Sequence, residues 1–178
     1  MSALGLSFGV PVSRHALAVA SAHDITFTSI DGAAMPLSAF AGQVVLVVNT
    51  ASRCGFTYQY DNLQALWAEY QDSGFTVIGV PTNDFGNQEP GTEAEIKEFC
   101  EVNFSVTFPM AEKVTTRGPY AHPFFGFVAD NLGDQALPRW NFHKYLIDPD
   151  GRLVASWGST TEPTSSAIRT EIDRLLIS

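Results

Sequence analysis

The feature that most constrains the fold is a continuous apolar run, Val44-Val45-Leu46-Val47-Val48. A β-branched run without polar alternation is typical of a strand that is buried on both faces. A second run of this kind extends from Phe75 to Val80. Between the two runs, residues 63, 66, 67 and 70 are apolar or aromatic at the i, i+3, i+4, i+7 spacing of a helix. The sequence therefore predicts an α/β fold in which helices cover a central sheet.

Weaker signals fill in the rest of the chain. Residues 25–37 turn at Asp31-Gly32 and predict an N-terminal β-hairpin. Thr92 and Glu95 have the spacing of a capping box, which opens a helix that extends to about residue 103. Residues 142–147 and 153–157 flank a turn and predict an antiparallel hairpin, and residues 165–176 predict an amphipathic helix. This order of elements is that of a thioredoxin-like domain, with a mixed central sheet flanked by helices.

The length of 178 residues fits one domain, which we expect to span residues 23–178. Residues 1–22 are interpreted as a leader, either a poor or truncated export signal or a disordered segment. Ala20-Ser21-Ala22 has the small-x-small form of a signal-peptidase site, but Arg14 is the only basic residue before it. We expect a cytoplasmic protein, or a periplasmic one if the leader is cleaved near Ala22. No apolar run reaches the roughly 18 residues of a membrane span, so none is predicted.

The formal net charge of -9 disfavours nucleic acid as a partner, because an acidic surface repels phosphate backbones. The two cysteines, Cys54 and Cys100, are too few for a disulfide framework. They are either buried structural thiols or a redox pair. The four histidines are scattered without the spacing of metal ligands, so we predict no metal site.

Cys54 follows the first buried strand, where the chain turns towards the first helical segment. Sites in open α/β sheets form at this edge, and backbone N–H groups at a helix N-terminus favour a thiolate, as would Arg53 beside it. From its position alone, Cys54 is equally well interpreted as a reactive thiol or as an inert buried thiol.

Thr57 occupies the second cysteine position of a Cys-x-x-Cys pair, which disfavours a paired disulfide shuttle. Attack by a single cysteine on another substrate, such as a peroxide, fits better.

Five blocks in order resemble the glutathione peroxidase family and cover the chain from about Ile25 to its end. They are residues 48–57 (VNTASRCGFT), residues 83–91 (NDFGNQEPG), residues 108–114 (FPMAEKV), His122-Pro123, and residues 140–146 (WNFHKYL). The resemblance implies a peroxidase that reduces hydrogen peroxide and organic hydroperoxides without a cofactor. It also implies a catalytic tetrad, which consists of Cys54, Gln88, Trp140 and Asn141. The amide and indole N–H groups of this set can donate hydrogen bonds to a thiolate or to the departing oxygen.

The resemblance also bears on the electron donor, which is thioredoxin or glutathione. The acidic chain offers few basic residues for glutathione, and cysteine forms of the family often use thioredoxin through a resolving cysteine. Cys100, in the segment after Thr92, is interpreted as that residue, or else as a cysteine packed in the core. The segment from His122 to Trp140 is short where tetrameric relatives carry an extra loop, which predicts a monomer. Two alternatives are a thioredoxin-like thiol–disulfide oxidoreductase and a non-enzymatic module that senses peroxide or binds a partner.

Overall fold

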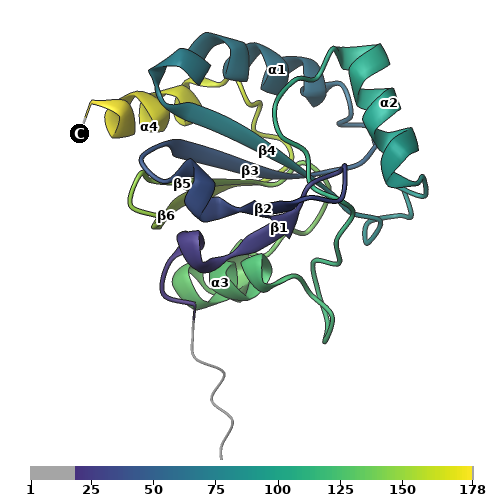
Figure 1. Cartoon of the computed structure of the whole chain (residues 1–178), viewed down its shortest axis with the longest axis horizontal. Coiled ribbons are helices and arrows are strands. Elements are labelled where there is room, and N and C mark those ends of the chain that lie inside the picture. Colours follow the sequence, from purple (N-terminus) through teal and green to yellow (C-terminus); the bar gives the residue numbers. More distant parts are fainter. Residues whose placement is uncertain (1–18, 178) are drawn as a thin grey trace, which may run out of the picture.

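A four-stranded mixed sheet forms the centre of the computed structural model, which describes residues 19–177 (Figure 1). Its strands lie in the order β4 (Phe75–Pro81), β3 (Val44–Thr50), β5 (Lys144–Ile147) and β6 (Leu153–Trp157). The β3 and β4 strands are parallel, whereas the β3–β5 and β5–β6 pairs are antiparallel. The predicted mixed sheet is confirmed, and its two buried strands, β3 and β4, lie side by side.

A separate antiparallel hairpin is formed by β1 (Thr26–Thr28) and β2 (Ala34–Pro36), as predicted. Gly32, in the turn of this hairpin, has φ +86°, a left-handed conformation that suits glycine. The Ile30 N–H donates to the Met110 carbonyl (2.9 Å), so the hairpin is joined to the rest of the domain by backbone hydrogen bonds.

Within residues 19–177 the α-helices are α1 (Gln59–Tyr70), α2 (Glu93–Phe104), α3 (Pro123–Leu132) and α4 (Ser166–Leu176). Short 3-10 helices span Ala22–Asp24, Leu37–Phe40, Gln71–Ser73 and Asp134–Ala136. The predicted capping box is present at α2, because Thr92 and Glu95 each accept a hydrogen bond from the other's backbone N–H. The α1, α2 and α4 helices therefore lie where the sequence predicts helices.

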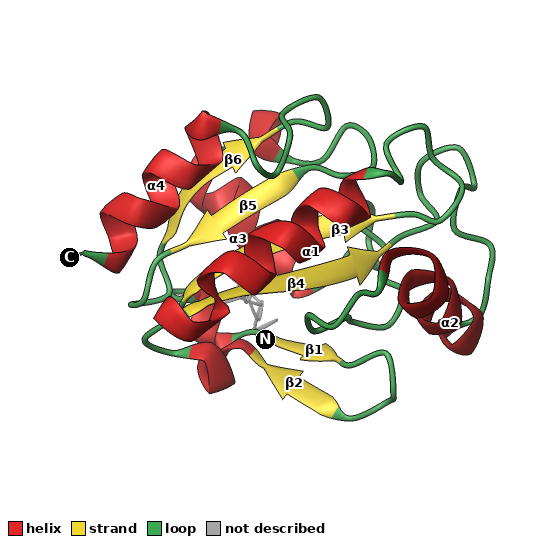
Figure 2. Ribbon diagram, turned by 90° about the horizontal axis from the view of Figure 1, so that it is seen from above, coloured by secondary structure: helices red, strands yellow, loops and turns green. Residues whose placement is uncertain are grey.

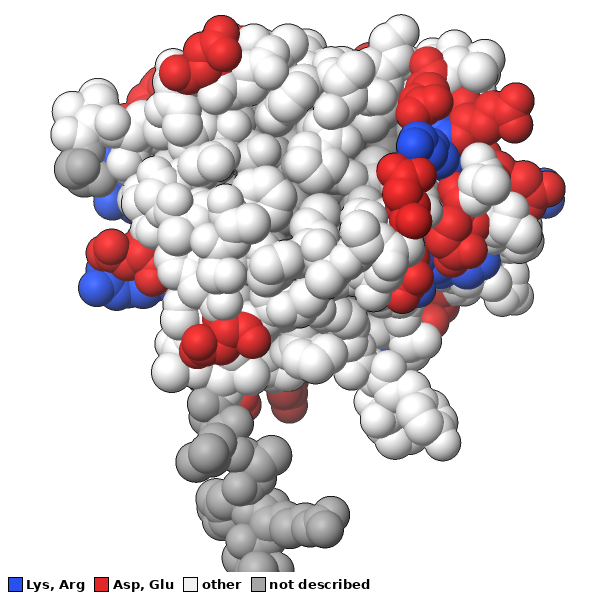
Figure 3. Space-filling model, viewed as in Figure 1, with Lys and Arg blue, Asp and Glu red and all other residues white. Residues whose placement is uncertain are grey.

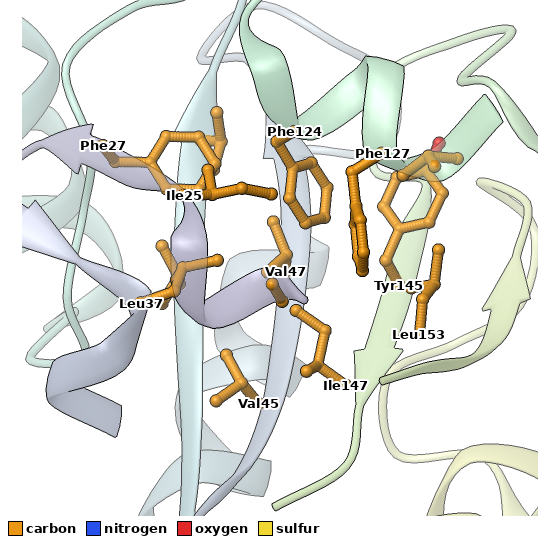
Figure 4. Packing of buried hydrophobic residues seen from close by; sticks show 14 of the residues in the cluster. Ile25, Phe27, Leu37, Val45, Val47, Phe124, Phe127, Tyr145, Ile147 and Leu153 are labelled. Carbon is orange, nitrogen blue, oxygen red and sulfur yellow. The ribbon is translucent and has the colours of Figure 1, made fainter. Parts of the chain in front are cut away.

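The helices cover opposite faces of the sheet (Figures 1 and 2). Val44, Leu46 and Val48 of β3 face a core that is shared with α1, α2 and α4. Val45 and Val47 point the other way, into a core with α3 and the N-terminal hairpin (Figure 4). Because side chains of a strand alternate between faces, the unbroken apolar run of β3 reflects burial on both.

The α3 helix was not predicted. Its ten residues contain Phe124, Phe125, Phe127 and Val128, all buried, with Gly126 among them. Such a sequence lacks the polar face that marks an amphipathic helix, and glycine lowers helix propensity. The helix forms because these aromatic side chains fill the second core, and because Pro123 at its first turn and the His122 cap favour its start.

Most of the expected leader, residues 1–18, lies outside the described residues, as does Ser178. Of the remainder, Ala22 is fully buried and donates its N–H to the Gly151 carbonyl (2.9 Å). Ser21 caps the short 3-10 helix that follows. Among residues 19–177, no helix is long and apolar enough to cross a membrane.

Candidate active site

The turn that carries Cys54 lies at the carboxyl end of β3 and is held by its own hydrogen bonds. Thr57 Oγ1 donates to the Ala51 carbonyl (2.9 Å) and accepts from the Cys54 N–H (3.0 Å). The Thr57 N–H donates to the Cys54 carbonyl (3.0 Å). The Phe56 N–H donates to Cys54 Sγ (3.4 Å), and the thiol is half-buried. A backbone N–H therefore points at the sulfur as expected, although α1 itself begins only at Gln59.

Gln88 reaches the same edge of the sheet from the loop that follows β4. Asn87 has a left-handed φ of +52°, and the Glu89 N–H donates to Asn83 Oδ1 (2.9 Å), so the loop is tightly folded. The Gln88 carbonyl accepts the N–H of Arg53 (3.0 Å). This backbone hydrogen bond joins the Gln88 loop to the residue directly before Cys54.

Trp140 and Asn141 lie on the third segment of the site, just before β5. Asn49, near the end of β3, donates through Nδ2 to the Trp140 carbonyl (3.0 Å) and accepts the His143 N–H at Oδ1 (3.0 Å). Phe142, between them, takes a left-handed φ of +61° and donates its N–H to the Asn49 carbonyl (2.6 Å). One buried asparagine thus fixes the backbone on both sides of Asn141.

Two members of the predicted tetrad are in direct contact. Asn141 is fully buried and donates through Nδ2 to Gln88 Oε1 (3.0 Å), while its Oδ1 has no partner in the described chain. Trp140 is 39% exposed, and its ring lies against the Gln88 loop, where a Cβ on Gly86 would meet it at 3.3 Å. Within residues 19–177 none of the three side chains hydrogen-bonds to Cys54 Sγ. The four residues therefore lie on three segments that hydrogen bonds join.

This arrangement can stabilise negative charge without a cation. Amide and indole N–H groups surround an edge of the sheet where one thiol is accessible, and an unpaired buried amide oxygen indicates a polar site rather than a packed core. A sulfur nucleophile at this place could attack a small electrophile while neutral donors hold the leaving atom.

Three arginines flank these segments, and the sequence analysis singled out Arg53 alone among them. The Arg117 guanidinium lies 4.6 Å from the centre of the Phe85 ring, and that ring is 6.1 Å from the ring of Trp140. Arg53 and Arg139 are exposed neighbours of Cys54 and Trp140 in the chain. In the described part of the chain, none of the three forms an ion pair with a carboxylate. For Arg139 the available signal was its position directly before Trp140, whereas no such signal marked Arg117 in the sequence.

Glu89 is a second residue without an assigned role. It is 1% exposed, and its carboxylate accepts a hydrogen bond from Ser52 Oγ (3.0 Å), two residues before Cys54. Burial raises the pKa of this carboxyl group, against the effect of the Ser52 hydrogen bonds. Nothing in the sequence distinguished Glu89 from an ordinary loop carboxylate, because only folding places it in a dry environment.

Cys100 lies on the buried face of α2 and is 1% exposed. Burial raises the pKa of its thiol to about 11, with a smaller rise from Glu89 and Glu101. The hydroxyl of Tyr60, also fully buried, lies near the Cys100 thiol and Thr50 without reaching hydrogen-bond geometry. Both cysteines are free thiols, so the predicted pair is not joined in this structure.

The contacts of His122 indicate a structural role. His122 stacks on Phe27 with ring centres 4.2 Å apart and accepts the Phe124 N–H at the start of α3. Burial lowers the pKa of His122, which keeps the ring neutral. Within residues 19–177, no three His, Cys, Asp or Glu side chains gather in a way that could hold a metal ion.

Comparisons of the sequence give one consistent result. A family model described as "Glutathione peroxidase" matches residues 22–129. The hydroperoxy fatty acid reductase gpx1 of Synechocystis is 47% identical over 156 residues, which cover 83% of this chain and 91% of that protein. A glutathione peroxidase-like peroxiredoxin of Schizosaccharomyces pombe is 43% identical over 143 residues, or 79% of this chain and 90% of the relative.

Solved structures agree on the fold. The crystal structure of Trgpx in apo form matches with a TM-score of 0.72 and 34% identity, over 89% of this chain and 96% of that one. A thioredoxin family thiol:disulfide interchange protein from Chlorobium tepidum matches with a TM-score of 0.61 over 85% of this chain and 92% of its own. At 16% identity the second likeness concerns the fold alone. The predicted thioredoxin-like fold is therefore confirmed.

Proposed function

The chain belongs to the glutathione peroxidase family, and we propose that it reduces peroxides with Cys54 as the attacking thiol. It is a thiol-dependent peroxidase, an oxidoreductase for which the peroxide is the electron acceptor. The names of its relatives, a hydroperoxy fatty acid reductase and a peroxiredoxin, support organic hydroperoxides as well as hydrogen peroxide as substrates. The observation that carries the proposal is the pair of hydrogen bonds that joins Gln88 to both Arg53 and Asn141.

In the first step, the Cys54 thiolate attacks one peroxide oxygen and the O–O bond breaks. The sulfur is oxidised to a sulfenic acid, and the other oxygen leaves as an alcohol or water after it takes up a proton. The amide groups of Gln88 and Asn141 and the indole N–H of Trp140 are the donors for the departing oxygen. Because they are neutral and held in place by the backbone, they can stabilise the developing charge without a large reorganisation.

The contacts of Thr57 speak against a thiol–disulfide shuttle as the main activity. Thr57 is buried and uses both its hydroxyl and its N–H to hold the Cys54 turn. A dithiol shuttle would need a second thiol at this position, within one turn of the first. The structural likeness to interchange proteins extends to the fold and not to this residue.

The second step is the attack of Cys100 on the Cys54 sulfenic acid, which yields a disulfide and one molecule of water. With a pKa raised to about 11 by burial, the Cys100 thiol is protonated and enclosed while α2 is folded. A disulfide also requires Cα atoms within about 7 Å. The step therefore proceeds through a local opening of α2, which exposes the thiol and allows it to ionise.

Thioredoxin is the proposed electron donor, since a dithiol protein can reduce the resulting disulfide by exchange. Acidic side chains gather around α2 (Figure 3), where Glu95, Glu98 and Glu101 are exposed. This charge repels an anionic tripeptide such as glutathione and so disfavours its binding at Cys100.

The short segment between His122 and Trp140 supports a monomer, which light scattering after size-exclusion chromatography would test.

Peroxide consumption, followed with either thioredoxin plus its reductase or glutathione, tests the function. Turnover with thioredoxin that is lost in Cys54→Ser is the expected result. The Cys100→Ser variant should consume one equivalent of peroxide and then stop with thioredoxin. Absence of turnover with both donors in the wild type, with Cys54 unoxidised by peroxide, would contradict the proposal.

A further inference from the structure

Lys144 is a fully buried lysine that no step of the proposed reaction uses. Its side chain is 0% exposed, which is rare for a residue that carries a charge. The ammonium group donates to Gln59 Oε1 (2.6 Å) and to the Ser159 carbonyl (3.3 Å). Gln59 in turn donates through Nε2 to the same Ser159 carbonyl (2.7 Å). The buried charge is therefore solvated by neutral groups of α1 and of the loop after β6.

Two connections bring this charge to the underside of the Cys54 turn. Lys144 of β5 pairs directly with Val48 of β3, the strand that leads to Cys54. On the other side, the Gln59 N–H donates to the Phe56 carbonyl (2.9 Å), and the Phe56 N–H donates to Cys54 Sγ (3.4 Å). Gln59, which holds the ammonium group, thus also binds Phe56, the residue whose N–H faces the sulfur.

The charge is not neutralised by a contacting carboxylate. In the described part of the chain Lys144 forms no ion pair, and Glu162 is the acidic group that acts on it from a distance. Glu162 is itself occupied by the Tyr58 hydroxyl (2.6 Å) and the Asn62 amide (2.8 Å). The titratable group directly before β5 is His143, whose pKa is lowered to about 4 mainly by burial, so it is neutral. The positive field of Lys144 is therefore little screened inside the domain.

We propose that Lys144 is a positioning residue for the peroxidatic thiol: held against Gln59 at the first turn of α1, its ammonium group supplies the positive charge that favours the Cys54 thiolate. This inference rests on the proposed function of Cys54. It explains how a protein with a net charge of -9 keeps a positive potential beneath its nucleophile.

The charge is also titratable. Burial lowers the pKa of Lys144 to about 7, against a smaller opposing effect of Glu162. Below this pH the charged ammonium form of Lys144 favours the Cys54 thiolate. Above this pH Lys144 is neutral and no longer does so. Lys144 therefore favours the nucleophilic form of Cys54 most strongly at lower pH.

The test is the pH profile of Cys54 alkylation by iodoacetamide, measured in a Cys100→Ser background so that one thiol reacts. In Lys144→Met, the rate at pH 6 should fall on the order of tenfold, the effect of a nearby unscreened charge. At pH 9, where Lys144 is neutral in the parent, the two rates should converge. Lys97→Met is the matched control, because Lys97 of α2 lies at the surface and pairs with Asp31 in the turn of the N-terminal hairpin, and it should leave the profile unchanged.

Structural damage would give a different pattern, since a misplaced turn lowers the rate at pH 9 as much as at pH 6. Lys144→Arg, which stays charged, should keep the rate at pH 6. Gln59→Glu provides a second approach if Lys144→Met folds poorly, because a carboxylate against the ammonium group cancels its field and should reproduce the loss at pH 6. Equal profiles in Lys144→Met and the parent, or a uniform loss at all pH values, would overturn the proposal.

Peroxide plays no part in the assay, so failure of the proposed function would appear separately, as a parent protein that alkylates normally but consumes no peroxide.

Discussion

The cap of α2 should control how fast Cys100 reaches Cys54. Thr92 Oγ1 accepts the Glu95 N–H (3.3 Å), and the Glu95 carboxylate accepts the Thr92 N–H (2.7 Å) and hydroxyl (3.0 Å). Beyond this cap little core packing holds α2 in place, because Ile96 and Cys100 are its only fully buried side chains. Thr92→Ala removes the side chain that completes the box, which costs about 1 kcal/mol of helix stability. If α2 opens before the thiols react, the opened population rises by roughly fivefold, since ~1.4 kcal/mol corresponds to tenfold.

The assay is a stopped-flow or rapid-quench measurement of disulfide formation after one equivalent of peroxide. The Thr92→Ala variant should form the disulfide about fivefold faster, while the preceding oxidation of Cys54 keeps its rate. Ser165→Ala is the matched control, because Ser165 stands at the N-cap of α4 without a side-chain capping bond. An unchanged or slower disulfide step in Thr92→Ala, together with a measured loss of thermal stability, would refute a resolving step that depends on the opening of α2.

Three further results are expected. Asn141→Ala should lower the rate constant of Cys54 oxidation by about 100-fold, because it removes one donor and leaves Gln88 Oε1 unpaired; a change below threefold in stopped-flow oxidation would argue against its role. Burial lowers the pKa of Lys144 from 10.5 to about 7, so between these values the unfolded chain binds the additional proton. The free energy of unfolding of the wild type should therefore rise from pH 7 to 9, with a slope approaching roughly 1.4 kcal/mol per pH unit that Lys144→Met lacks in urea titrations. Phe124→Ala should cost about 3–5 kcal/mol in the same titrations, since Phe124 is fully buried on the core side of α3, and a loss below 1 kcal/mol would contradict its place in the core.

Periodic segments of the sequence predicted their structures well, and segments whose structure depends on tertiary contacts did not. The β3 run and the α2 capping box carry local signals, because burial on two faces and capping each need particular residues at fixed spacing. The α3 helix carries none, since its aromatic side chains are buried by a core that forms only when the chain folds.

The same division applies to the site. Cys54, Gln88, Trp140 and Asn141 lie in blocks that resemble a family, and their roles follow from that resemblance rather than from spacing. Asn49 and Lys144 lie in the same blocks, but the resemblance implied no role for either. From the sequence alone, Asn49 is interpreted as the polar end of a strand. Lys144 lies on a predicted strand, where a lysine is expected to be exposed. Only the structure shows that one organises the Trp140 segment and that the other is enclosed against Gln59 at the start of α1.

The two helices next to the thiols are anchored very differently. The first turn of α1 is tied to the loop after β6 through Gln59 and through Glu162, whereas the exposed link of α2 to the N-terminal hairpin is the ion pair of Lys97 with Asp31. Oxidation would therefore reshape one side of the molecule and leave the other almost unaltered. A protein that must distinguish the oxidised form from the reduced form needs to recognise only the α2 surface. The redox state of a buried sulfur would thus be displayed as a change of shape on the outside of the molecule.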